Sequence, residues 1–358
     1  MISQQERAIG VASRNVKLIK KGKFLIGFLL AAMAGGAQAQ TITSLDFPGA
    51  SATAAFAINK SGVIAGTYAD TSETGHGFVR SAAGVFTSFD APRQGPAGPH
   101  SVAINSSGVI VGYDTDSGSV IHGFVRSKTG KVTVFDAPGA GTLSGTGTFV
   151  SGLNDAGTII GWYVDSSNLH HGYVRAANGT FTGFDPSGSG LTAPAGIDAV
   201  GDIAGTYRDT SNVWHGFIRT AGGTITSYDE PDAGTTAGRG TFGGAMNAAG
   251  DITGWYVDST GIEHGFERSA TGTFTSFDAK FAGNTVAFAI STKDVIAGPY
   301  TDKHNAEHSY VRAKSGKVTD FDPPGSTATE AWGVDAAGDV TGYYVDASSV
   351  VHGFLRTP

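Results

Sequence analysis

The sequence predicts an all-β fold, a seven-bladed β-propeller of four-stranded antiparallel blades in which an N-terminal strand completes the last blade. Three observations predict this fold. A short motif recurs seven times at intervals of 44 to 49 residues, each repeat holds four strand-like segments, and the last repeat lacks a strand that the chain's start can supply. Repeats of this length and strand count are typical of propeller blades.

The recurring motif is His-Gly-Phe-Val-Arg or a close variant, with an Asp six residues before each copy. The pairs are Asp70/His76, Asp116/His122, Asp165/His171, Asp209/His215, Asp258/His264, Asp302/His308 and Asp346/His352. A second Asp follows six of the His residues by fourteen positions, as Asp90, Asp136, Asp185, Asp229, Asp278 and Asp322. Asp and His can serve metal binding or acid–base catalysis. Because an active site is normally single, seven copies favour a structural hydrogen bond in which the Asp of each pair orients its His.

The first repeat shows how each unit is read. Its expected strands A to D span residues 54–59, 63–68, 76–81 and 85–90. Asn59, followed by Gly62 three residues later, favours a tight A–B turn, and we call the Asn59 position the turn residue. The Arg that closes the motif, such as Arg80, is expected to pair with a neighbouring Asp or carbonyl group.

Strand A is expected to lie innermost, because the residue two positions before the turn residue is always small. These residues are Ala57, Ala103, Gly152, Gly196, Ala245, Ala289 and Gly333. Small side chains allow strands to converge on an axis.

The two ends of the chain complement each other. The seventh repeat stops at Arg356 without a strand D, and residues 42–46 match residues 86–90 of the first repeat. We expect the N-terminal segment to complete the last blade, which would close the ring and remove exposed sheet edges.

Residues 1–39 read as a secretory signal peptide, and residues 40–358 as one propeller domain. Basic residues precede an apolar run at 24–33, and Ala37-Gln38-Ala39 has the small-x-small pattern of a cleavage site. The apolar run is too short to span a bilayer as a helix. The expected product is secreted, to the periplasm or the medium, with no membrane anchor after cleavage.

The composition of the exported part restricts its partners. Of the 24 Lys and Arg residues, six precede residue 40, which leaves 18 against 30 Asp and Glu. An acidic surface argues against a nucleic-acid partner. The chain has no cysteine, and no pattern indicates a metal site or a cofactor. A monomer is expected.

The segment from Ala57 to Gly66, followed by His76-Gly77-Phe78, resembles the HAF repeat of bacterial extracellular proteins. The resemblance covers almost all of residues 41–358, with Gly in the Ala place of six copies and Ser309 in the other. It implies export and a repeat scaffold, and it transfers no activity.

Candidate functional residues lie where the repeat breaks its own pattern. Insertions fall in the D–A loops between blades, the longest at 141–149 and 234–242. Because B–C loops lie on the same face, this face is the expected binding face. The second long loop carries Arg239, with Glu230 just before it, and Trp214 and Trp332 are irregular aromatic residues. For Trp162 and Trp255 on strand B, packing between blades is favoured over a stacking platform.

The channel mouth supplies another candidate pair. Five residues before the turn residue, only His100 and Glu330 are titratable. They could form an acid–base couple or hold a ligand, although a solvated channel rim without a function is favoured.

Two functions compete. The favoured one is a non-catalytic extracellular scaffold that binds carbohydrate or protein through the D–A and B–C loop face. The alternative is an extracellular enzyme that acts on a polysaccharide or a lactone at the channel mouth, which requires His100, Glu330 and Arg239 to converge.

Overall fold

The computed structural model describes residues 40–93, 95–280 and 282–358, so the predicted signal peptide lies outside the described residues. All regular elements in this range are β-strands, which confirms the all-β prediction. A search of the same range finds no helix with the length and apolar character needed to cross a membrane.

Antiparallel pairings link the strands into runs that follow the chain order. Run 1 contains β2 (Ala52–Ile58), β3 (Ile64–Ala69), β4 (Gly75–Arg80) and β5 (Phe86–Phe89). Run 2 contains β6 (His100–Ile104), β7 (Ile110–Thr115), β8 (Ile121–Arg126) and β9 (Val132–Phe135). Run 3 contains β10 (Gly147–Leu153), β11 (Ile159–Val164), β12 (His170–Arg175) and β13 (Phe181–Phe184). Run 4 contains β14 (Ser189–Ile197), β15 (Ile203–Asp209), β16 (Trp214–Arg219) and β17 (Ile225–Tyr228).

The remaining runs repeat this pattern with two variations. Run 5 contains β18 (Gly240–Met246), β19 (Ile252–Val257), β20 (Glu263–Arg268) and β21 (Phe274–Phe277). In run 6 strand A is split, giving β22 (Ala282–Thr285), β23 (Ala289–Ile290), β24 (Ile296–Asp302), β25 (Glu307–Arg312) and β26 (Val318–Phe321). Run 7 contains β27 (Ser326–Val334), β28 (Val340–Asp346) and β29 (Val351–Thr357), followed by β1 (Thr41–Leu45).

The predicted pairing of the two chain ends is present. Strand β1 lies antiparallel to β29, with a register from Thr41 opposite Thr357 to Leu45 opposite Gly353. The Ser44 hydroxyl also lies 2.8 Å from the Tyr344 hydroxyl of β28. The first strand of the chain therefore forms the outer edge of the last run.

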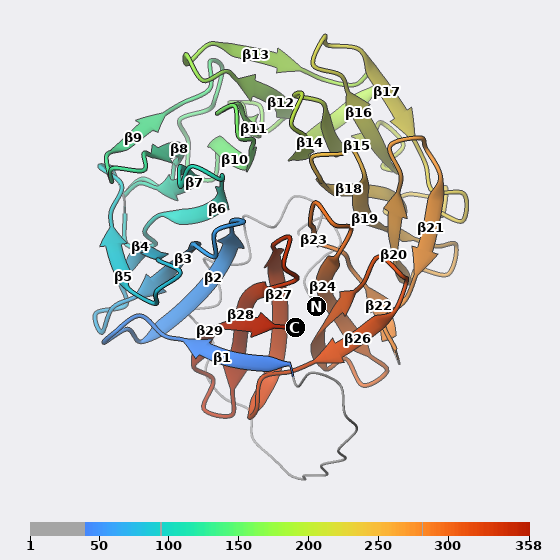
Figure 1. Cartoon of the computed structure of the whole chain (residues 1–358). Coiled ribbons are helices and arrows are strands. Elements are labelled where there is room, and N and C mark those ends of the chain that lie inside the picture. The colour runs from blue at the N-terminus through green and yellow to red at the C-terminus, as the bar shows by residue number, and fades with distance from the viewer. Residues whose placement is uncertain (1–39, 94, 281) are drawn as a thin grey trace.

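The runs follow one another around a common centre, with strand A of each run innermost (Figure 1). Neighbouring A strands are in contact all the way from β2 to β27, and β27 contacts β2. Single parallel bridges also join runs 2 to 5 into one 16-stranded sheet. The small residues predicted for strand A are closely packed, because a Cβ on Gly196 would overlap the Met246 backbone of the next run.

The interface between runs is built on the last aromatic residue of strand D. Phe89 of run 1 lies edge-on to Phe124 of run 2, with ring centroids 5.9 Å apart, and the Arg126 guanidinium lies 5.2 Å from the Phe89 centroid. The same arginine-over-ring contact recurs at Arg175/Phe135, Arg219/Phe184, Arg268/Tyr228, Arg312/Phe277 and Arg356/Phe321. Such contacts contribute about 0.5–2 kcal/mol each.

These contacts add to the expected role of the motif arginines, because their recurring partner is an aromatic ring of the preceding run. The expected carbonyl contact is found at three of them. These are Arg126, Arg219 and Arg268, and Arg312 pairs with Glu267 at 2.6 Å. Leu45 occupies the aromatic position in β1, and Arg80 lies instead near Phe86 of its own run. The aromatic residue at the end of strand D also explains the glycine of the motif. A Cβ on Gly77 would enter the Phe89 ring.

The turn residues form a second set of links between runs. The Asn59 carboxamide oxygen accepts hydrogen bonds from the Ser61 and Val63 amides of its own turn. Its Nδ2 donates to the Asn105 carbonyl of the next run at 3.0 Å. Asn105, Asn154 and Asn247 make the corresponding contact to the next run. The other three turn residues, Asp198, Ser291 and Asp335, have no amide to donate.

Replacing Asp198 with Asn should restore a missing link in this series. The new Nδ2 would face the turn at residue 247 while Oδ1 continues to accept from the amides of its own turn. We expect a gain of about 1 kcal/mol in the free energy of unfolding, measured by urea denaturation. The matched control, Asn154→Asp, should lose a similar amount. Unfolding midpoints that do not move in opposite directions would contradict this role.

Candidate functional site

The innermost strands share an irregularity that places one side chain of each run at the centre. The register of strand A shifts two to three residues before the turn residue, for example between Ala55 and Ala57 and between Ala331 and Gly333. The same shift occurs in β6, β10, β14 and β18, and run 6 has its strand break at this place. Such bulges re-aim side chains. The residues three positions before the turn residue are Phe56, Val102, Ser151, Ala195, Gly244, Phe288 and Trp332.

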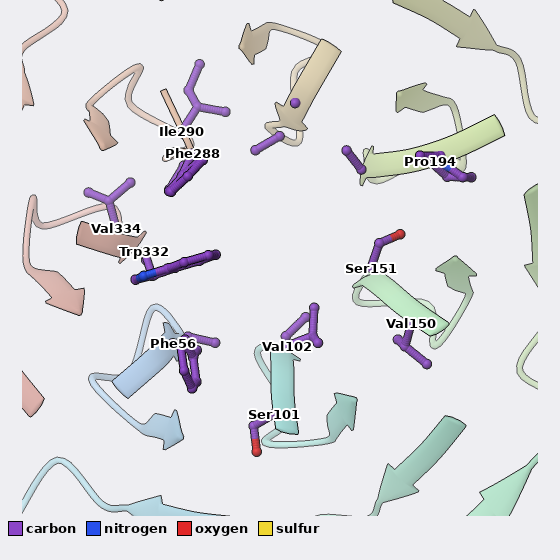
Figure 2. Close-up of a pocket in the computed structure, with 18 of the residues that line it drawn as sticks. Phe56, Ser101, Val102, Val150, Ser151, Pro194, Phe288, Ile290, Trp332 and Val334 are labelled. Atoms are coloured by element: carbon purple, nitrogen blue, oxygen red, sulfur yellow. The ribbon is translucent and has the colours of Figure 1, made fainter. Parts of the chain in front are cut away.

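These central residues are not distributed evenly. The three aromatic ones belong to neighbouring runs 6, 7 and 1, whereas runs 3, 4 and 5 present small residues. Trp332 stacks on Phe288 with centroids 4.7 Å apart and meets Phe56 edge-on at 5.7 Å. Figure 2 shows Phe288, Trp332 and Phe56 side by side, with Ser151 and Pro194 across the opening. We call these three residues the aromatic wall.

The aromatic wall borders a central cavity of about 290 Å³. Its lining comes from the A strands of all the runs, together with Tyr113, Trp162, Thr206 and Trp255 of strand B. Trp162 stacks on Phe149 and Trp255 on Phe242, with centroids 5.1 and 5.2 Å apart. The tryptophans of strand B therefore pack within the core and also reach the cavity.

Many polar atoms of the lining are turned away from the cavity. The Ser101 hydroxyl donates to the Gly66 carbonyl, and the Thr206 hydroxyl donates to the His215 carbonyl. The Ser151 hydroxyl and the indole nitrogens of Trp162 and Trp332 are buried and have no hydrogen-bond partner among the described residues. The surface offered to a ligand is therefore mainly apolar and aromatic.

The innermost strands, which line the cavity, are more exposed at the A–B turn end than at the other end. The residue directly before the turn residue is apolar in every run, and it is half-buried in all runs except run 2, where Ile104 is buried. The half-buried residues are Ile58, Leu153, Ile197, Met246, Ile290 and Val334. At the D–A loop end, five of the seven residues that stand five positions before the turn residue are buried, and Ala54 and Phe149 are half-buried. The buried ones are His100, Ala193, Phe242, Val286 and Glu330. The exposure pattern favours entry from the A–B turn face.

His100 lies in the cavity wall but is poorly suited to charge chemistry. Its ring is stacked on Tyr113 and lies 4.4 Å from the Phe56 centroid. Burial lowers the pKa of His100 to about 4, so the imidazole is neutral at pH 7. His100 therefore contributes an uncharged ring to the cavity wall and not a positive charge.

The other predicted site residues lie apart from the cavity lining, except for Trp332. Glu330 is buried opposite Tyr343 in the pairing of β27 with β28. Trp214 is buried against Phe242, with the Arg208 guanidinium 5.6 Å from its ring. Neither Glu330 nor Trp214 contributes to the lining.

Arg239 and Glu230 are engaged in their own loop region. The Arg239 guanidinium donates to the Ser259 carbonyl. The Glu230 carboxylate accepts from the Ser276 hydroxyl at 2.5 Å and from the Asp232 amide at 2.7 Å. Sequence reasoning missed Phe56 and Phe288, although comparing the position three residues before the turn residue across the repeats would have found them.

The expected pairing of the motif histidines is borne out in part and needs one correction. The expected hydrogen bond is present at His122/Asp116 and His352/Asp346, at 3.4 and 3.5 Å, but the nearer partner of each histidine is a different aspartate. Each histidine lies between two carboxylates, and its Nδ1 is 2.6–3.0 Å from the Asp that ends strand D. Its Nε2 is 3.4–3.9 Å from the expected Asp of the B–C loop. The nearer pairs are His76/Asp90, His122/Asp136, His171/Asp185, His215/Asp229, His264/Asp278, His308/Asp322 and His352/Asp46.

The pairing of strands C and D is the physical reason for this correction. Because these strands are antiparallel, the Asp after the end of strand D comes beside the histidine near the start of strand C. The Nε2 atoms of His171, His264 and His308 are 3.5, 3.6 and 3.9 Å from the expected B–C loop carboxylates. For His352 the nearer Asp46 comes from the N-terminal segment, which the sequence match alone could not pair with a histidine. None of the motif histidines belongs to the lining of the central cavity.

The B–C loop aspartates serve mainly to cap their own loops. Asp70 accepts hydrogen bonds from the Thr74 and Ser72 amides, and these bonds lower its pKa. Within the part of the chain that the structure describes, no group of three or more His, Asp and Glu side chains is arranged to hold a metal ion.

Run 2 departs from the other runs at its histidine. Six of the motif histidines stack on a tyrosine of strand B, as His76 does on Tyr68 at 5.0 Å. In run 2 Asp114 takes the tyrosine position, opposite His122. Asp114 is 1 % exposed, and its carboxylate has no hydrogen-bond partner among the described residues. Burial raises its pKa to about 6, although His122 and Arg93 act in the opposite direction.

Comparisons with known proteins identify the fold. No protein-family model and no curated protein sequence matches the chain. Among solved structures, BP39L lectin from Burkholderia pseudomallei has a TM-score of 0.55 at 11 % identity, covering 86 % of this chain and 96 % of the lectin. The β-propeller domain of the Trilobed protease from Pyrococcus furiosus has a TM-score of 0.53 at 12 % identity, covering 85 % and 95 %. The fold is a β-propeller.

A puromycin hydrolase structure gives a TM-score of 0.56 at 11 % identity, with 84 % of this chain covered. This propeller spans 52 % of the length of that hydrolase. At such identities the likeness concerns the fold alone.

The buried Asp114 carboxyl should make stability depend on pH. Because its pKa is higher in the folded protein than in the unfolded chain, unfolding releases a proton, and stability falls as pH rises from about 4 to 6. Between pH 4.5 and 7.5, the wild type should lose about 1–3 kcal/mol relative to Asp114→Asn, measured by urea denaturation.

Asp165→Asn is the matched control for this measurement. Hydrogen bonds, first from the Leu169 amide, lower the Asp165 pKa, so its pH-dependent contribution is lost only as pH falls below about 4. Parallel stability curves for the wild type and Asp114→Asn between pH 4.5 and 7.5 would contradict the raised pKa.

Proposed function

We propose that this chain is an exported, non-catalytic binding protein, a closed seven-bladed propeller whose ligand site is the central cavity. Each run would be one blade, and β1 would complete the seventh. The pairing of β1 with β29, and the contact between the innermost strands β27 and β2, support closure. Export rests on the signal-like residues 1–39 and on the resemblance to HAF repeats.

The aromatic wall is the observation that carries the binding function. Phe288, Trp332 and Phe56 form a continuous aromatic surface on one side of the cavity, and small residues leave room on the other side. Ligand pockets are generally concave and largely apolar, with few polar groups. Repeat architecture alone would place similar residues in every blade, so this asymmetry favours a function.

The site proposed here differs from the loop face expected from the sequence. Arg239 and Glu230 on that face are engaged in local hydrogen bonds. Of the expected partners, carbohydrate and extracellular protein, the cavity's size favours a single ring or one projecting side chain over a folded protein surface. The enzyme alternative is less favoured, since neither Glu330 nor Arg239 joins His100 in the cavity lining.

Removing the central indole should test this function. Trp332→Ala should weaken ligand binding at least tenfold, because it removes the middle of the aromatic wall. Binding would be measured by thermal shift and calorimetry against glycans, peptides and small ring compounds, with polysaccharide and lactone hydrolysis assayed in parallel.

Arg239→Ala, on the loop face, is the control for Trp332→Ala and should bind like the wild type. Ligand binding that is lost in Arg239→Ala and kept in Trp332→Ala would move the site to the loop face. Hydrolysis that depends on His100 would overturn the non-catalytic assignment.

A further inference from the structure

We infer that the central cavity binds a small, uncharged aromatic molecule of one or two fused rings, entering from the A–B turn face. This inference rests on the proposed function and names the ligand class of the same site.

The size of the cavity sets the first limit. A cavity of roughly 150 Å³ lined by apolar side chains accommodates one benzene ring. The central cavity has about twice that volume, about 290 Å³. It therefore has room for a one- or two-ring compound, and an oligosaccharide would place only one end inside.

The aromatic wall gives the cavity three ring-bearing lining residues, against which an aromatic ligand can pack. Trp332 is stacked on Phe288 with an interplanar angle of 29° and meets Phe56 at 85°. The wall thus combines a stacked pair with an edge-to-face pair. Aromatic rings prefer these two geometries, which contribute about 0.5–1.5 kcal/mol beyond the apolar area they bury.

The polar groups of the wall argue against a sugar. A sugar carries several hydroxyl groups, and each one buried without a partner costs about 1–3 kcal/mol. The Ser101 and Thr206 hydroxyls are committed to backbone carbonyls, and the Ser151 hydroxyl and Trp332 indole nitrogen are buried. The cavity therefore favours a ligand with few polar groups.

The charge of the wall argues against an ion. The lining contains no Asp, Glu, Lys or Arg, and its single histidine is His100. A charged ligand would lose its hydration without gaining an opposite charge. The ligand is therefore uncharged, and the half-buried aliphatic residues Ile58, Ile290 and Val334 provide an apolar entrance.

The experiment uses indole and 2-naphthol as probes with residues 40–358, the chain without its predicted signal peptide. Calorimetry should show binding of at least one probe, at least tenfold tighter than that of methyl glucoside and benzoate. Ala195→Phe, which fills the open side of the cavity without touching the aromatic wall, should reduce probe binding at least tenfold. Trp332→Ala should do the same, and Arg239→Ala should change binding less than twofold.

The outcomes separate this inference from the proposed function. Tighter binding of methyl glucoside or another sugar, lost in Ala195→Phe, would overturn the aromatic ligand class and leave the cavity as the binding site. Glycan or peptide binding that persists in a folded Ala195→Phe variant would overturn both. Circular dichroism and the unfolding midpoint establish that each variant is folded. Absence of probe binding to the folded wild type would overturn the aromatic inference by itself.

Discussion

The structure depends on one contact repeated between neighbouring runs, in which the strand D aromatic residue of one run packs against the next. Phe89 contacts both the Phe124 ring and the Arg126 guanidinium, and it also occupies the space that a side chain on Gly77 would need. One side chain thereby fixes both the strand C glycine of its own run and the arginine of the next. The Gly and Arg of the His-Gly-Phe-Val-Arg motif therefore both serve the interface between neighbouring runs.

The same regularity explains why the centre can carry function. Since the outer contacts hold the runs together, the side chain placed at the bulge of strand A is free to vary. Phe56, Phe288 and Trp332 use that freedom on three neighbouring strands, whereas Ala195 leaves space opposite them. A scaffold with repeated interfaces can thus hold a site without repeating it.

Much of the fold could be predicted because the repeats align without gaps in strands B to D, and because residues 42–46 match the strand missing from the last repeat. The cavity and its aromatic wall were harder to predict from the sequence. Strict alternation along strand A hides the bulge that brings Phe56 and Trp332 to the centre. The strand D aspartates were seen, but their closeness to the histidines depends on the pairing of strands C and D. His100 and Glu330 share a repeat position, yet only His100 lines the cavity.

The pairing of β1 with β29 has a consequence for how the molecule assembles. The outermost strand of the last run precedes all the other described strands in the sequence, and its partner β29 follows them. The segments that meet here are far apart in the sequence, since Ser44 and Tyr344 are separated by 300 positions. Contacts of such long sequence separation form slowly. The outer edge of the last run therefore depends on a pairing between opposite ends of the described sequence, which makes it a slow contact to form.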